Sequence, residues 1–65
     1  MITIVKVSNI SIDGTAVFEF RCKSSDDKPV GFYDVAIVGN GSTLTEMDTS
    51  KVYMFDGENQ SWGEL

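Results

Sequence analysis

The side chains that could perform nucleophilic or metal-dependent chemistry are few in this 65-residue chain. It contains one cysteine, Cys22, and no histidine. A Ser-His-Asp or Cys-His site therefore cannot be built, no second thiol exists for an intrachain disulfide, and a zinc site lacks its usual ligands. We expect no enzymatic activity, no metal and no cofactor. Because Cys22 falls in an alternating apolar pattern, we interpret it as a small core residue rather than a nucleophile.

Carboxylates occur in two pairs that could bind a cation or exchange protons. These are Asp26 with Asp27, and Asp56 with Glu58. Both pairs fall in predicted turns, where we expect them to be solvated and to keep their ordinary pKa values. The oxygens of Asp56, Glu58 and Asn59 could converge on Ca²⁺. The complete calcium-loop pattern is absent, so the sequence favours an Asx-type turn.

Two further polar features are also interpreted structurally. Asp34 is a lone carboxylate in an apolar segment and is expected to face solvent or to be capped, since a general base would need a proton-transfer partner. The run Gly39-Asn40-Gly41 lacks the spacing and the lysine of a phosphate-binding loop, and it predicts a tight turn.

Length and charge restrict the class of protein. A chain of 65 residues forms one domain (residues 1–65), and folding buries only about 60% of its surface. Without a disulfide or a metal, stability must come from a well-packed sheet or from oligomerisation. The ten acidic and five basic residues give a net charge of −5, which argues against nucleic acid or an anionic membrane as partner. No apolar run approaches a membrane span, and the start lacks the pattern of a signal peptide.

The elements that must position these groups are predicted to be strands. Five Ile, seven Val, five Thr and seven aromatic residues favour a pleated surface, and turn-forming residues recur every 8 to 15 positions. We therefore expect an all-β fold, a small antiparallel meander or partly closed barrel of five to six strands. The first strand covers residues 2–7, with residues 10–12 continuing it or forming a separate short strand. Asp13-Gly14 predicts a type I′ hairpin turn.

The clearest alternation lies in residues 15–23. It assigns Ala16, Phe18, Phe20 and Cys22 to the core and the intervening residues mostly to solvent. After a polar loop at residues 24–29, residues 30–38 are apolar on both faces and predict a strand that is central in the sheet or lies against a partner.

The C-terminal third predicts two consecutive hairpins. Residues 42–47 pair with residues 51–55, which pair in turn with residues 60–65. Tyr53 and Phe55 alternate with Val52 and Met54, so both faces of the middle strand carry bulky apolar groups. Trp62 is expected in the same cluster. A face that is not buried in so small a domain would be a contact surface.

Residues 41–62 resemble a segment found in small proteins of tailed bacteriophages and prophages. The shared pattern is roughly G-S-x-x-x-E-x-D-T-G-K-x-Y-x-F-D-x-x-x-x-x-W, and the chain departs from it at Ser50, where glycine is usual. The resemblance covers about the last third to two-fifths of the chain and implies a structural or decoration role in the virion. A three-residue hairpin loop would need a left-handed residue there, so Ser50 either bears a small strain or shifts the turn.

These observations predict a non-enzymatic phage virion accessory or decoration protein that is made in the bacterial cytoplasm. It would dock on a capsid or tail surface, or on copies of itself, as a homo-oligomer or part of a larger assembly. The alternatives are a small acidic inhibitor that imitates nucleic acid in the groove of a host defence protein, and a carbohydrate-binding module that uses Tyr53 and Trp62. The residues expected to form the core and the protein contact are Phe32, Tyr33, Tyr53, Phe55 and Trp62.

Overall fold

The computed structural model describes residues 1–65 and is all-β, with eight strands and no helix. It thus holds no helix that could cross a membrane. The strands form a five-stranded sheet and a three-stranded sheet, and neither closes into a barrel. Their bounds are β1 (Thr3–Val7), β2 (Thr15–Ala16), β3 (Phe18–Cys22), β4 (Phe32–Tyr33), β5 (Ala36–Val38), β6 (Thr43–Glu46), β7 (Val52–Asp56) and β8 (Ser61–Glu64).

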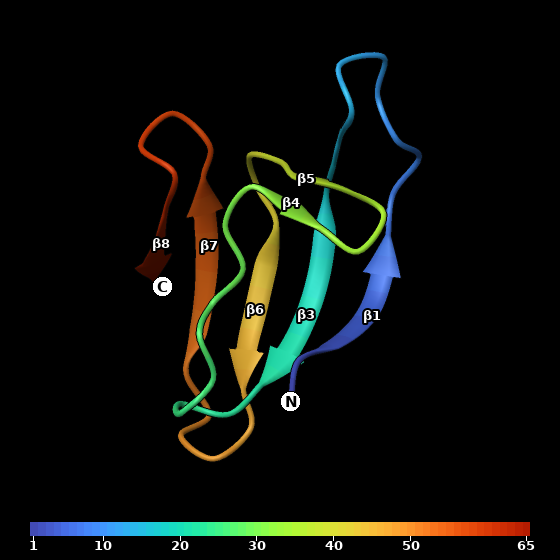
Figure 1. The fold of residues 1–65 in the computed structure, drawn as a ribbon. Coiled ribbons are helices and arrows are strands. Elements are labelled where there is room, and N and C mark those ends of the chain that lie inside the picture. Colours follow the sequence, from blue (N-terminus) through green and yellow to red (C-terminus); the bar gives the residue numbers. More distant parts are fainter.

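The larger sheet has the order β1-β3-β6-β7-β8. Its C-terminal part confirms the two predicted hairpins, because β6 pairs antiparallel with β7 and β7 antiparallel with β8. The expected antiparallel meander of five to six strands is only partly matched, because there are eight strands and because β2 runs parallel to β5 and β3 parallel to β6. Figure 1 shows how this arises: the chain leaves β3, crosses one face of the sheet as the green segment, and re-enters as β6 in the same direction.

The predicted strand at residues 15–23 is divided between the two sheets. Ala16 belongs to β2 and Phe18 to β3, while Val17 between them is exposed and donates its backbone N–H to the Ser8 hydroxyl. Ala16, Phe18, Phe20 and Cys22 are all buried, as the alternation predicted. The alternation predicted the buried side correctly, because successive side chains keep pointing to opposite sides where the chain passes from β2 to β3.

The prediction of a single central strand at residues 30–38 is wrong. This segment folds into a hairpin of β4 and β5, which joins β2 in the smaller sheet, in the order β2-β5-β4. Gly31 and Asp34 take positive φ values of 76° and 61°, and the Val35 N–H donates to the Tyr33 carbonyl to close a very tight turn. The hairpin lies across one face of the larger sheet and covers it (Figure 1).

The first hairpin turn also differs from expectation. The Gly14 N–H donates to the Ser11 carbonyl, and the Ser11 N–H to the Thr15 carbonyl. Gly14 has φ of 87°, whereas Asp13 is not in the left-handed region. This is a three-residue loop with a glycine bulge rather than a two-residue type I′ turn. Residues 10–12 form no strand.

The core lies between the two sheets. It is made of eight buried residues: Ala16, Phe18, Phe20, Cys22, Ala36, Val38, Leu44 and Phe55. The rings of Phe18 and Phe20 stack with their centroids 4.9 Å apart. Burial raises the pKa of the Cys22 thiol, which agrees with its interpretation as a core residue.

Candidate docking surface

The smaller sheet presents an apolar row on the side that faces away from the core. Phe32 pairs with Ile37, and Ile37 with Thr15, so these three side chains point outward. Their neighbours Tyr33 and Ala36 form the next pair and point inward. The same alternation that buries one face of this sheet therefore exposes the other.

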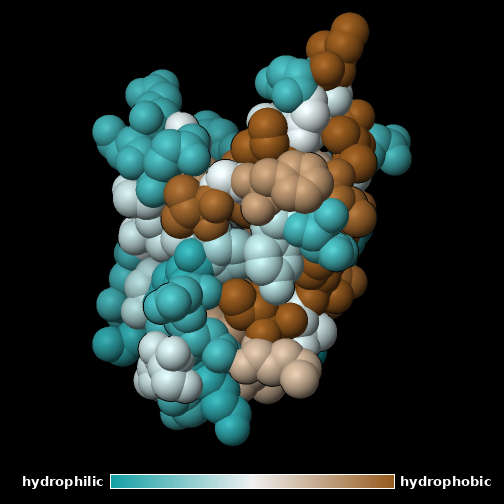
Figure 2. Space-filling view, in the orientation of Figure 1, coloured by the Kyte–Doolittle hydropathy of each residue, from teal (hydrophilic) through white to brown (hydrophobic).

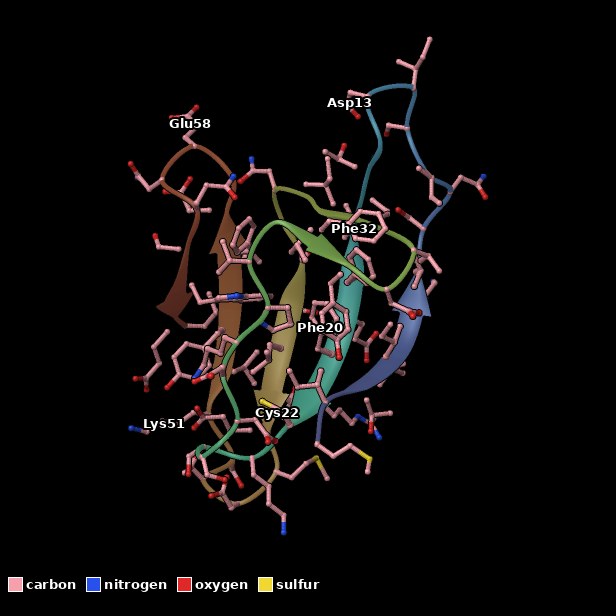
Figure 3. The ribbon with its side chains drawn as sticks, in the orientation of Figure 1. Asp13, Phe20, Cys22, Phe32, Lys51 and Glu58 are labelled. Atoms are coloured by element: carbon pink, nitrogen blue, oxygen red, sulfur yellow. The ribbon has the colours of Figure 1, made fainter.

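Phe32 is the aromatic residue of this row, and 68% of its surface is accessible to solvent. Val30 and Val35 flank it and are about half exposed, and Ile37 is partly buried beside it. We call these four residues the Phe32 surface. Figure 2 shows brown and tan atoms gathered over β4 and β5, while teal atoms dominate at the loop between β7 and β8. Figure 3 shows the Phe32 ring standing off the β4 ribbon toward the viewer.

A hydrogen bond from β8 fixes the segment that leads into this surface. The indole Nε1 of Trp62 donates to the Pro29 carbonyl at 2.8 Å, although 33 residues separate the two in sequence. The Trp62 ring also packs against Phe20 and Phe55, with centroid distances of 6.0 Å and 5.1 Å. Tyr33, directly after Phe32, places its ring edge-on to Phe20 at 5.5 Å. Phe32 is therefore carried on a backbone that is held on both sides.

An ion pair fixes the same segment one residue earlier. Lys28 Nζ lies 2.8 Å from Oε2 of Glu46, whose side chain is 4% exposed, and 4.4 Å from the centre of the Tyr53 ring. The Thr49 hydroxyl donates to Oε1 of Glu46 at 2.6 Å. Hydrogen bonds from Lys28 and Thr49 hold the pKa of the Glu46 carboxyl below its ordinary value, and the bond to Glu46 raises the pKa of Lys28. Both groups therefore stay charged at neutral pH.

The structure separates the five aromatic residues that the sequence predicts for the core and contact surface. Phe55 is 1% exposed and belongs to the core. Tyr33, Tyr53 and Trp62 are half-buried and pack against that core. Only Phe32 offers most of its ring to solvent. The Trp62 ring packs on the core and its indole N–H is bonded, so this residue has a structural role in the fold.

The aliphatic part of the surface was not predicted as a site. Val30, Val35 and Ile37 belong to the segment whose two apolar faces had suggested a central strand. The two apolar faces of this segment do have separate roles, since one face is buried against the core and the other forms the Phe32 surface. Gly31, just before Phe32, was the residue that could have indicated a bend, because glycine readily takes positive φ.

One carboxylate of each pair, Asp26 or Asp56, accepts local hydrogen bonds, which corrects the expectation of an ordinary pKa for these two groups. Asp26 accepts from the Lys23 N–H and from the N-terminal amine, and these bonds lower its pKa. Asp56 accepts from the Asn59 side-chain amide and from the Glu58 N–H, which lower its pKa too. The predicted Asx-type turn is thus confirmed. No three acidic or cysteine side chains gather where they could hold a metal ion.

Comparison of the chain with known protein families, with curated proteins and with solved structures found no match.

Proposed function

We propose that this chain is a non-enzymatic accessory or decoration protein of a tailed-phage virion. It docks on a capsid or tail surface, or on other copies of the chain, through the Phe32 surface. The observation that carries the proposal is the exposure of Phe32 on a hairpin whose backbone is fixed by Trp62 and by the Lys28–Glu46 pair.

A rigidly presented aromatic ring is well suited to anchor a protein contact. Phenylalanine can bury about 150–250 Å², and little conformational entropy is lost on binding when the backbone is already ordered. Contacts of this kind are usually dominated by a few large side chains surrounded by smaller apolar ones. Ile37, paired with Phe32 across the strands, and the half-exposed Val30 and Val35, within three residues of Phe32 in sequence, are the smaller apolar side chains of this surface.

The residues that carry the phage resemblance have structural roles in this fold. The Ser42 hydroxyl accepts from the Phe18 N–H and donates to the Gly39 carbonyl. Glu46 binds Lys28, Asp48 accepts from the N–H and hydroxyl of Ser24, and Trp62 binds Pro29. The pattern thus specifies a scaffold that fastens the covering segment, and the Phe32 surface lies outside it. Proteins that share the pattern would present different contact residues on a common frame.

Co-sedimentation with virus particles tests the proposal. Purified chain is mixed with tail-less capsids or with isolated tails of a phage that encodes it, and bound protein is measured in the pellet. We expect saturable binding that Phe32→Ser reduces at least tenfold. Ile12→Ser is the matched control, because Ile12 is fully exposed but lies outside the Phe32 surface, and it should bind normally.

Two results would overturn the proposal. One is the absence of binding to both kinds of particle by a chain that also stays monomeric at high concentration. The other is equal binding of Phe32→Ser and the wild type. The salt dependence of binding distinguishes a virion surface from the basic groove of a nucleic-acid-binding protein. A contact anchored by the apolar Phe32 ring should persist at about 0.5 M salt, whereas an acidic mimic of nucleic acid should be released from a basic groove because salt screens the charges.

A further inference from the structure

A shallow hollow lies where the turn between β4 and β5 meets β1, an edge strand of the larger sheet. It has a volume of about 480 Å³ and is lined by Ile2, Ile4, Tyr33 and Asp34. Figure 1 shows this turn beside β1. Ile2, Ile4 and Tyr33 pack against the core, so the lining is apolar except for Asp34. We call this place the Asp34 hollow.

The Asp34 carboxylate has no partner within the chain. Asp26 and Asp56 accept hydrogen bonds from backbone N–H groups close to them in sequence. Asp34 is exposed, accepts no hydrogen bond and joins no ion pair. Its negative charge is therefore available to a group from outside the chain.

The backbone of Asp34 is held in the left-handed region, with φ of 61°. Aspartate visits this region more readily than most residues because its short side chain can bond to the nearby backbone. Asp34 makes no such bond, so its carboxylate does not stabilise the turn that it occupies. Strained residues of this kind are concentrated at sites of binding and catalysis, and this one lies at the border of a hollow.

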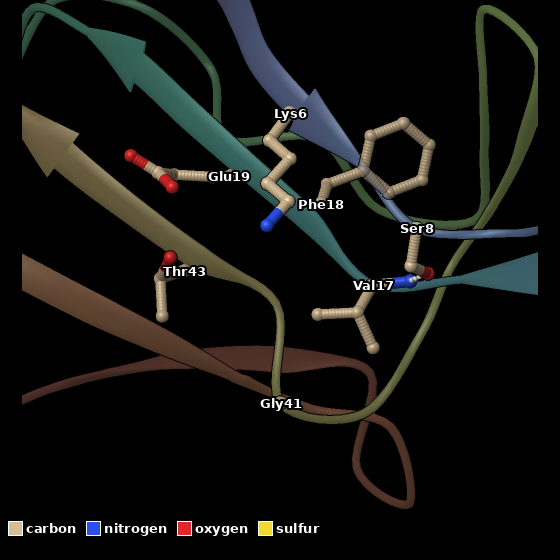
Figure 4. A pocket seen from close by; sticks show the side chains of 7 residues that line it. All are labelled: Lys6, Ser8, Val17, Phe18, Glu19, Gly41 and Thr43. Carbon is tan, nitrogen blue, oxygen red and sulfur yellow. Dashed lines mark hydrogen bonds between the residues drawn. The ribbon is translucent and has the colours of Figure 1, made fainter.

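No basic side chain of the chain lines the Asp34 hollow. Ile4 faces the core side of the sheet, because its cross-strand partner Phe20 is buried. Lys6 and its partner Glu19 lie on the other side, where Figure 4 shows them around a separate hollow. Arg21 is on that side too, since it alternates with Phe20 along β3. The net charge of −5 adds to the attraction that Asp34 exerts on a cation.

We propose that the Asp34 hollow receives an arginine side chain of the protein that the Phe32 surface contacts. The methylene groups of the arginine pack on Ile2 and Ile4, and its guanidinium group forms two parallel hydrogen bonds with the Asp34 carboxylate. The Tyr33 ring offers an aromatic surface to the guanidinium plane. Lysine fits less well, because its ammonium group is more strongly hydrated and cannot form the paired bonds.

The inference rests on the proposed function, because it names a residue of the same partner. Asp34 follows Phe32 by two positions, and two residues span at most about 7 Å. A protein that covers the Phe32 ring therefore also reaches the Asp34 carboxylate. The ring would supply most of the affinity, and the ion pair would select partners that carry an arginine beside the apolar contact.

An NMR titration of the ¹⁵N-labelled chain with capped amino acids tests the hollow directly. N-acetylarginine methylamide should shift the amides of Ile4 and Asp34 in a saturable way. N-acetylcitrulline methylamide has nearly the same shape but no charge, and it should bind about threefold more weakly, as expected for an exposed ion pair. N-acetyllysine methylamide should also bind more weakly than the arginine compound.

Two variants with the same change of charge identify the carboxylate. Asp34→Asn keeps a residue that tolerates positive φ, so it should fold, and thermal unfolding checks this. It should bind the arginine and citrulline compounds equally. Asp27→Asn is the matched control, because Asp27 is also exposed and without a partner but lies outside the hollow. It should keep the preference for arginine.

The co-sedimentation assay then tests whether the partner supplies the arginine. Asp34→Asn should bind particles about threefold more weakly than Asp27→Asn. Equal particle binding of these two variants, together with impaired binding of Phe32→Ser, would overturn the inference and leave the proposed function intact. In the titration, the inference fails if no shifts occur at Ile4 and Asp34, if citrulline or lysine binds as well as arginine, or if Asp27→Asn loses the preference as Asp34→Asn does. These failures are distinct from that of the proposed function, because the titration contains no particle.

Discussion

Replacing Trp62 with phenylalanine should loosen the segment that presents Phe32. The change keeps an aromatic ring against Phe20 and Phe55 but removes the N–H that reaches the Pro29 carbonyl at 2.8 Å. Pro29 is buried, and no other hydrogen bond within the chain reaches its carbonyl. An orphaned buried acceptor costs about 1–3 kcal/mol. A domain of this size has a total unfolding free energy of roughly 3–10 kcal/mol, so the loss is a large share of it.

Urea unfolding followed by far-UV circular dichroism measures this loss, since the variant has no tryptophan to report by fluorescence. Tyr53→Phe is the matched control: Tyr53 lies on the neighbouring strand, its hydroxyl makes no intrachain hydrogen bond, and the ring that Lys28 contacts is kept. We expect the control to change the unfolding free energy by less than about 0.5 kcal/mol.

Hydrogen exchange provides a second, local measurement. The Val38 N–H donates to the Gly31 carbonyl within the covering segment, and the Phe55 N–H donates to the Ser42 carbonyl between β6 and β7. In Trp62→Phe the Val38 amide should lose more protection than the Phe55 amide, because the lost bond fastens the covering segment. Equal stability of Trp62→Phe and Tyr53→Phe would refute the role assigned to the Trp62–Pro29 bond.

Three further predictions concern the turns, the ion pair and the core. Ser50 and Gln60 end their hairpin loops with φ of 61° and 53°, so Ser50→Gly and Gln60→Gly should each stabilise the fold by about 0.5–1 kcal/mol in urea unfolding; a loss of stability would contradict the strain. The pKa of Glu46 is lower in the folded protein than its ordinary value of 4.5. Its carboxylate therefore stabilises the fold at pH values above 4.5, and this contribution is lost as the pH falls through the pKa of the folded state. Thermal scans of wild type and Glu46→Gln should therefore differ most at neutral pH and converge in acid, and a difference that persists at pH 2 would count against this account. Ser42 is fully buried and makes hydrogen bonds of 3.0 Å and 2.8 Å, so Ser42→Ala should cost about 1–3 kcal/mol by chemical denaturation, whereas a neutral effect would show that the two bonds contribute little.

The resemblance of residues 41–62 raised a question at Ser50 that the structure answers. Ser50 takes the left-handed conformation that glycine would adopt more easily, and its N–H donates to the Glu46 carbonyl. The loop between β6 and β7 holds four residues, since the Glu46 N–H donates to the Lys51 carbonyl across it. Ser50 therefore bears the strain, and the strand register that follows is kept.

The sequence alone determined which side chains enter the core of β3 and which strands form the C-terminal hairpins. Alternation along Phe18, Phe20 and Cys22 is a local property, because successive side chains of an extended chain must point to opposite sides. Pairing across a short loop is also local, so β6, β7 and β8 could be predicted from turn residues and apolar runs.

Only the tertiary structure decided the path of residues 30–38 and the identity of the exposed ring. Two apolar faces are compatible with a central strand or with a hairpin that buries one face, and local pattern cannot choose between them. The choice is made by partners far away in sequence, since Trp62 holds Pro29 and Glu46 holds Lys28. Because those contacts fold the segment over the sheet, Tyr33 turns inward and Phe32 faces solvent.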